Sequence, residues 1–402
     1  MSAAAKPRPV LPKTAKVAPK RTLTFDPEFD LLLACCTTEP SGDHIQQLLS
    51  SQIDWNRWLS LLDHHRVIPQ VYRALAGLCR SMPDDTFIAL QSSYQENARK
   101  ALWFTGELVR LVGHLESLGI KTLIYKGPAL AKILYGEVTQ RQFCDLDILV
   151  RPVDVPRARV ALLDLGYKSQ IELTLRQERD YIDSGYEYAF RNRDNQNLLE
   201  LQWKILPRFY SVDFDATTFF DRAGEIHLGG SALATLRPSD LMLVLCVHAA
   251  KHMWCELSLL CDIAQLASSP RLNWNTIHSQ ARRLGIERVL LLNLLLANLL
   301  LGARLPFSIQ QMCRQTTTIT TLANEIQLII ARNQHYDAES IPYFRFMIRL
   351  RERPQDRARL LARLIFTPSL REWSTIRLPE PLSPLYRLVR LSRLARRLAS
   401  PS

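Results

Sequence analysis

The chain has 402 residues, of which 47% are hydrophobic, so it can bury a large core and is not disordered throughout. Its net charge is +12, but residues 1–22 carry +6 and residues 345–402 carry +10, which leaves −4 for the body between them. A mildly acidic body argues against a fold that reads nucleic acid, and we expect no stable DNA binding.

The cysteines and apolar segments predict a cytoplasmic protein. Eight cysteines are spread along the chain without a CxxC pair, which favours reduced core residues over a disulfide or zinc framework. Residues 1–25 have no apolar segment and are expected to form a disordered basic tail rather than a signal peptide. The longest apolar stretch, Val289 to Ala303, contains Asn293 and Asn298 and is shorter than the ~20 residues of a bilayer span. It therefore predicts a buried helix.

Helical periodicity dominates both halves of the chain, with a short α/β section between them. Residues 26–118 form a predicted N-terminal helical region, including a long helix over 84–118. His64 and His65 resemble an exposed helix end with a structural role. The α/β core is expected over 119–236, with strands at 121–125, 145–150, 186–190 and 198–205 and helices at 129–135 and 156–165. A helical domain over 237–335 and an Arg-rich helical region over 336–402 follow.

Three acidic residues lie in the predicted strands. Because side chains two residues apart on a strand face the same side, Asp145 and Asp147 share one face of the sheet. Two adjacent carboxylates repel each other unless a cation lies between them, and Mg²⁺ prefers such oxygen ligands. Glu200, inside the strand at 198–205, would complete a two-metal site. An isolated Asp-x-Asp is otherwise often a solvated turn or a surface calcium-type site.

These residues lie in a longer pattern that resembles the bacterial uncharacterised nucleotidyltransferase family of the polymerase-β-like superfamily. The similarity covers most of the chain from about residue 28 to 395. It rests on Lys126 to Ala131, Tyr135-Gly136, Arg141, Asp145 to Val150, Glu200 to Trp203, His248 to His252, Trp254, Leu257, Asp262-Ile263, Leu378-Pro379 and Leu385 to Arg387.

The resemblance implies an α+β fold, with a minimal nucleotidyltransferase mixed β-sheet flanked by helical regions. It also implies that the turn at Lys126-Gly127 receives a triphosphate, although superfamily members usually have Gly-Ser there. The glycine and the following helix N-terminus suit an anion, and Lys126 would add a point charge. Arg141 is expected either to bind the triphosphate or pyrophosphate, or to pair with a nearby acid. Gln202 departs from the histidine of many relatives.

The activity implied is transfer of a nucleoside monophosphate from an NTP to an unidentified acceptor, with release of pyrophosphate. Asp145, Asp147 and Glu200 would be catalytic and would hold Mg²⁺, with two ions expected and Mn²⁺ as an alternative. A catalytically inactive member of the same fold that binds a nucleotide or a partner is the alternative, suggested by Lys126-Gly127 and Gln202.

The sequence leaves the roles of two further features open. His248, Lys251 and His252 lie on one predicted helix, where a substrate contact, a metal site with Asp262 and a structural role are all options. Near the C-terminus, arginines from Arg387 to Arg397 alternate with leucines in a basic amphipathic helix. Such a helix suits an acidic partner, a membrane surface or RNA, or it packs its leucines on the body.

Overall fold

The computed structural model describes residues 25–78, 81–173, 175–192, 198–334, 336, 340–367, 376, 382 and 385–399. The predicted basic tail lies outside the described residues except for its last position. The Leu378-Pro379 pattern also lies outside them.

Five helices form the N-terminal part of the chain. They are α1 (Pro27–Cys36), α2 (Gly42–Leu49), α3 (Trp55–His65), α4 (Ile68–Leu75) and the 34-residue α5 (Asp84–Ser117). Asp26, Ser41 and Asp54 begin the first three helices, because each side chain accepts a hydrogen bond from a first-turn amide. The long helix predicted over 84–118 is confirmed, and it ends one residue earlier, at Ser117.

A mixed five-stranded sheet follows, in the order β1-β2-β5-β4-β3. The strands are β1 (Thr122–Leu123), β2 (Asp145–Val150), β3 (Lys168–Ser169), β4 (Glu187–Arg191) and β5 (Leu198–Gln202). Strands β2 and β5 are parallel, and the other neighbours are antiparallel. The expected α+β fold with a mixed sheet is confirmed.

The first strand is shorter than the predicted 121–125, and the reason is a hairpin that the sequence did not indicate. Strands β6 (Gly224–Leu228) and β7 (Ser231–Thr235) pair with each other, and Ile124 donates its amide to the Ala234 carbonyl of β7 at 2.9 Å. The hairpin turn has positive φ at Gly229 and Gly230, as a two-residue turn of primed type requires.

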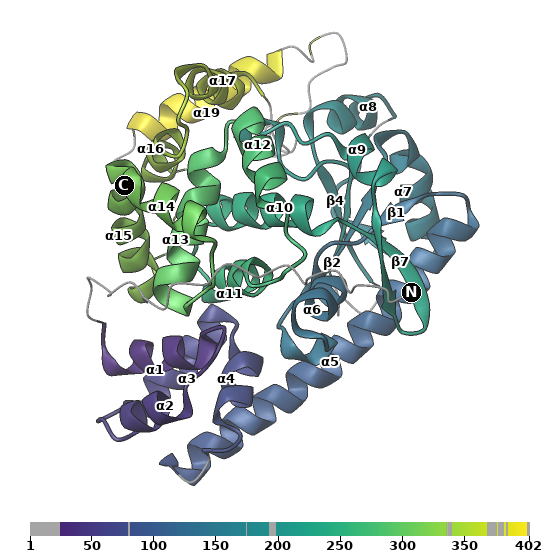
Figure 1. Ribbon diagram of the computed structural model, residues 1–402. Coiled ribbons are helices and arrows are strands. Elements are labelled where there is room, and N and C mark those ends of the chain that lie inside the picture. The colour runs from purple at the N-terminus through teal and green to yellow at the C-terminus, as the bar shows by residue number, and fades with distance from the viewer. Residues whose placement is uncertain are drawn as a thin grey trace, which may run out of the picture.

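Helices cover both faces of the sheet (Figure 1). They are α6 (Gly127–Tyr135), α7 (Val155–Asp164), α8 (Leu175–Ser184) and α9 (Ala216–Asp221), with short 3₁₀ helices at Val138–Gln140, Pro152–Asp154 and Arg208–Tyr210. Leu146, Ile148 and Leu201 point from one face into a core shared with α5 and α7. Because side chains alternate along a strand, the polar residues of β2 and β5 point to the other face.

The remaining helices lie on the opposite side of the sheet from α7, and among them α13 contacts α1 of the N-terminal helices (Figure 1). They are α10 (Pro238–Lys251), α11 (Leu257–Ala267), α12 (Trp274–Leu284), α13 (Glu287–Leu301), α14 (Phe307–Gln315), α15 (Thr317–Ala331), α16 (Ile341–Arg349), α17 (Pro354–Phe366) and α19 (Tyr386–Ala399). Their core includes buried residues of α1 and α3, so the N-terminal helices share one hydrophobic cluster with the helical region that follows the sheet. No helix within the described ranges is long and apolar enough to cross a membrane.

Four sequence-based expectations about single residues need correction or refinement. His65 is fully buried rather than exposed, and its Nδ1 accepts a hydrogen bond from the Leu257 amide at 3.3 Å. Cys144 is exposed, unlike five buried free cysteines elsewhere. In α19, Arg390 is buried and donates to the Leu364 carbonyl, whereas Leu388 is exposed. Thus α19 does not simply divide into a basic outer face and a leucine inner face.

Asn293, a polar residue within the long apolar segment, has a structural role in α13. Asn293 is fully buried, accepts from Trp254 Nε1 at 2.7 Å, and donates to the carbonyls of Val289 and Cys246 at 2.8 and 3.1 Å. These bonds tie α13 to α10 and to the segment after α10.

We expect Asn293→Ala to lower the free energy of unfolding by about 2–4 kcal/mol, because it leaves the buried indole N–H without an acceptor. Urea denaturation measures this. Asn298→Ala, which removes one half-buried hydrogen bond to the Ala303 carbonyl, is the matched control and should cost about 1 kcal/mol. An equal loss in both variants would contradict the role assigned to Asn293.

Candidate active site

All nine residues predicted for the site line one pocket of about 320 Å³. They come from the start of α6, the segment before β2, β2 and β5, and the end of α10: Lys126, Gly127, Arg141, Asp145, Asp147, Glu200, His248, Lys251 and His252. Tertiary structure therefore brings together side chains that are up to 126 positions apart in the chain.

The three acids share the polar face of the sheet. Parallel pairing of β2 with β5 sets Asp147 directly beside Glu200, and Asp145 lies two residues earlier on the same face. Asp147 is only 2% exposed, and its Oδ2 is buried without a hydrogen-bond partner in the described part of the chain. A buried carboxylate with an unsatisfied oxygen is costly, so this arrangement favours a cation at the site.

The Lys126-Gly127 turn joins β1 to α6 beside these acids. Lys126 Nζ lies 2.8 Å from Asp147 Oδ1, and Gly127 has φ +53, a conformation in which glycine is least strained. Pro128 removes one of the amide donors in the first turn of α6. The anion-binding capacity of this helix start therefore depends on the amides of Gly127 and Ala129 and on the Lys126 ammonium.

Gln202 connects the carboxylates. Its Oε1 accepts a hydrogen bond from Tyr125 Oη at 2.5 Å, which fixes the amide orientation. Its Nε2 then faces Asp147 Oδ1 at 2.8 Å and Glu200 Oε2 at 3.0 Å. Gln202 thus supplies an uncharged donor that holds two acids in place.

The concentration of negative charge changes the proton affinity of the acids. Burial, followed by the charges of Asp147 and Glu187, raises the pKa of Glu200 to about 9. Burial and the charge of Asp147 raise the pKa of Asp145 to about 6. Burial is the largest single effect and opposes the charge on Lys126, but the combined attraction of Asp147 and the other acidic groups around it outweighs burial and raises the lysine pKa. Lys126 is therefore the cation that partly balances the acids.

The end of α10 closes the pocket with basic groups. Lys251 Nζ lies 3.4 Å from Tyr186 Oη and 5.0 Å from the centre of its ring. The rings of His248 and His252 are 4.5 Å apart, and burial together with the charge of Lys126 lowers the pKa of His248. His248 is consequently neutral near pH 7 and can offer a hydrogen bond rather than a charge.

Arg141 forms the ion pair that the sequence left as an alternative. Its Nη2 lies 2.9 Å from Asp262 Oδ2, and its Nε donates to both oxygens of that carboxylate at 3.0 and 3.1 Å. Tyr135 Oη also donates to Asp262. Asp262 therefore holds Arg141 rather than joining the two histidines in a metal site.

Several residues of the site were not identified from the sequence. Glu187 lies opposite Gln202 in the antiparallel pairing of β4 and β5, with its Oε2 3.5 Å from Gln202 Nε2. Glu187 lies in the strand predicted at 186–190, so the alternation of polar and apolar residues along that strand would also have identified it. Arg66 and Glu256, which form an ion pair at 3.3 Å, come from two loops and carry no such signal.

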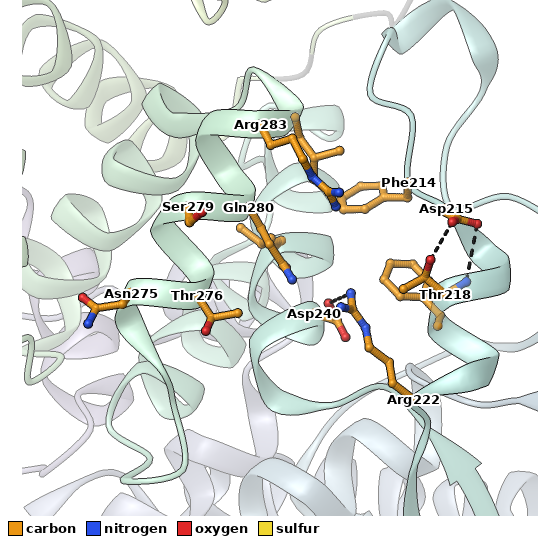
Figure 2. Close-up of a pocket in the computed structure, with 13 residues that line it drawn as sticks. Phe214, Asp215, Thr218, Arg222, Asp240, Asn275, Thr276, Ser279, Gln280 and Arg283 are labelled. Carbon is orange, nitrogen blue, oxygen red and sulfur yellow. Dashed lines mark hydrogen bonds and ion pairs between the residues drawn. The ribbon is translucent and has the colours of Figure 1, made fainter.

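A larger cavity of about 600 Å³ between α9, α10 and α12 contains none of the nine residues (Figure 2). Arg222 and Asp240, which point toward each other in it, form an ion pair at 2.5 Å. Their charges are thus already balanced, and the candidate site is the smaller pocket.

The carboxylates of the smaller pocket are candidate ligands of Mg²⁺. Among the described residues, no three His, Cys, Asp or Glu side chains already form a group that could hold a metal ion. Mg²⁺, however, commonly takes one or two carboxylates and completes its shell with substrate phosphates and water. Asp145 and Asp147, with the unpartnered Oδ2, fit that requirement.

We expect Glu200→Gln to melt at a higher temperature than the wild type without metal ions, and the difference to grow with pH. From the ordinary value of 4.5 to about 9, the folded wild type keeps a proton that the unfolded chain has lost. Wild-type stability therefore falls as pH rises through that window. Thermal melts in EDTA from pH 5 to 9 measure the difference, with the exposed Glu225→Gln as control. A difference independent of pH would contradict the raised pKa.

Comparison with known proteins identifies the family of the chain. A family model described as uncharacterised nucleotidyltransferase matches residues 51–302, more than half of the chain. A solved structure described as an antigenic nucleotidyltransferase-like protein from Paracoccidioides brasiliensis is 15% identical, with a TM-score of 0.29, and the match covers 53% of this chain and 95% of that one. No curated protein matches. By the family match, the chain belongs to the uncharacterised nucleotidyltransferase family.

Proposed function

We propose that the protein is a metal-dependent nucleotidyltransferase that moves a nucleoside monophosphate from an NTP to an acceptor and releases pyrophosphate. The observation that carries the proposal is the gathering of Asp145, Asp147 and Glu200 in one pocket beside the Lys126-Gly127 turn. Acids alone would repel a triphosphate, so the same pocket needs the cations that its other residues and a bound metal supply.

The turn at the start of α6 is the proposed triphosphate site. The helix N-terminus favours negative charge, and Lys126 brings an ammonium group to the same place. In the structure, this ammonium group is bonded to Asp147. A phosphate oxygen at the turn would share or take over that cation.

Asp145 and Asp147 are the proposed ligands of Mg²⁺, or of Mn²⁺ in its place, and Glu200 is the third acid of a two-metal site. Bound metal would neutralise phosphate charge and lower the pKa of the acceptor hydroxyl. The protein residues fix the geometry: Gln202 holds Asp147 and Glu200 through one amide nitrogen, and the sheet register fixes their spacing.

The chemical step is an in-line displacement at the α-phosphorus. The acceptor hydroxyl passes its proton to water and its oxygen forms a bond to that phosphorus, while the bond to the β-phosphate bridging oxygen breaks and pyrophosphate leaves with its electron pair. Holding both reactants in one pocket supplies much of the rate gain expected for such a reaction. The acceptor is the one reactant that the nine residues do not define.

We expect Asp145→Asn and Asp147→Asn each to reduce magnesium-dependent pyrophosphate release at least about 100-fold, because each removes a charged metal ligand. The assay incubates purified protein with each labelled NTP, Mg²⁺ and cell extract, and detects pyrophosphate and the labelled product. Asp164→Asn, an exposed acid at the end of α7, is the control and should keep full activity. Wild-type turnover in the folded double variant would disprove the assignment.

A nucleotide-binding protein without catalysis is the second candidate. The ion pair of Lys126 with Asp147 favours it, because the ammonium group already occupies one carboxylate oxygen that a metal ion would use. Calorimetry with a non-hydrolysable NTP distinguishes the two functions. For the enzyme we expect binding to weaken at least about tenfold when Mg²⁺ is replaced by EDTA. Metal-independent binding together with no turnover of any NTP would favour the second candidate.

A further inference from the structure

A second cavity adjoins the candidate active site. It has a volume of about 720 Å³, within the usual range of small-molecule sites of about 300–1,000 Å³. Its walls are the end of α3, the start of α4, the middle of α5 and the loop before β2. We call it the side cavity. Five residues line both it and the active-site pocket: Arg66, Gln142, Phe143, Cys144 and Glu256.

We propose that the side cavity binds the nucleoside part of the NTP, whose phosphates lie at the Lys126-Gly127 turn. This inference rests on the proposed function and adds to it a site and a ligand class.

Its position is the first argument. A Cβ at Gly127 would lie 3.6 Å from the Asp145 carbonyl oxygen, so the phosphate turn directly abuts the start of β2. Cys144, the preceding residue, already belongs to the side cavity. A nucleotide with its phosphates at the turn can therefore extend past Asp145 into this cavity.

The opposite end of the active-site pocket is suited to the acceptor. Glu200, His248 and Lys251 line the active-site pocket but not the side cavity. Glu200, the third acid of the proposed two-metal site, lies in β5, on the other side of β2 from β1. In-line displacement places the acceptor oxygen opposite the leaving pyrophosphate, and a nucleoside in the side cavity leaves the Glu200 end of the pocket free for that acceptor.

The charge of the side cavity argues for an uncharged ligand group. Its two cations are already paired, Arg66 with Glu256 at 3.3 Å and Lys100 with Glu96 at 2.5 Å. Asp63 adds a further acid, so the lining has no excess of positive charge that would attract another phosphate. Carboxylates are good acceptors for the hydroxyl groups of a ribose.

The remaining lining suits a base. The rings of Phe104 and Phe143 lie 5.8 Å apart at 67°, and they offer apolar surface to a planar heterocycle. Asn97 uses its Nδ2 on the Thr139 carbonyl, which leaves its Oδ1 as an acceptor. Gln142 uses its Oε1 on the Ile68 amide, which leaves its Nε2 as a donor. Donor, acceptor and apolar surface in one cavity are the features a nucleobase needs.

The test uses two adjacent serines of α5. Ser93 lines the side cavity, whereas Ser92 is exposed and does not. Ser93→Trp would fill the cavity, and Ser92→Trp is the matched control. Calorimetry with Mg²⁺ measures binding of the α,β-methylene analogues of ATP, GTP, CTP and UTP, and of inorganic tripolyphosphate, which has no nucleoside.

We expect Ser93→Trp to weaken the preferred analogue at least about tenfold and to leave tripolyphosphate within about twofold, while Ser92→Trp changes neither. Unchanged analogue binding by folded Ser93→Trp would overturn the proposal, as would equal losses for both ligands. If Ser93→Trp does not fold, Ser93→Leu, a smaller side chain at the same position, should give the same split. Wild-type protein that binds neither ligand would instead refute the proposed function.

Discussion

The excess of negative charge on one face of a buried sheet is the constraint on which the site depends. Parallel pairing of β2 and β5 sets Asp147 beside Glu200, and Asp145 adds a third carboxyl on the same face. Three acids so close and so shielded from water cannot all ionise without a nearby positive charge. The surrounding structure offsets this negative charge with Lys126, the Gln202 amide and the basic end of α10.

Such a site is unfavourable for stability, which fits a functional rather than a structural origin. Burial raises the pKa of both Asp145 and Glu200, so each carboxyl loses its proton less readily in the folded protein than in water. An apolar residue at any of these positions would avoid that cost. By contrast, Arg141 and Asp262 form a complete buried ion pair next to the pocket, with all their charges matched. The Arg141–Asp262 pair is thus a balanced buried charge, whereas the three acids of the pocket carry an excess of negative charge.

The helical regions position the pocket as well as stabilise the fold. Helix α5 packs its second half under the sheet through Leu108 and Leu111, while its middle forms a wall of the side cavity. Helix α10 lies in the large helical core, yet its last turn brings His248 and Lys251 to the sheet. The helical regions on either side of the sheet section therefore both contribute to the pocket, although its acids come from the sheet.

The sequence by itself determined the two strands that carry the acids, the turn and helix beside them, and the helix that carries His248 and Lys251. Alternation along Asp145 to Val150 and the isolated Glu200 were enough to put three acids on strands, because side-chain direction on a strand follows from local geometry. Only the tertiary structure decided which residues pair across the chain: Arg141 with Asp262, Lys126 with Asp147, and Tyr125 with Gln202. The β6–β7 hairpin, the burial of His65 and the side cavity arose in the same way, since each depends on contacts between segments whose proximity no local pattern encodes.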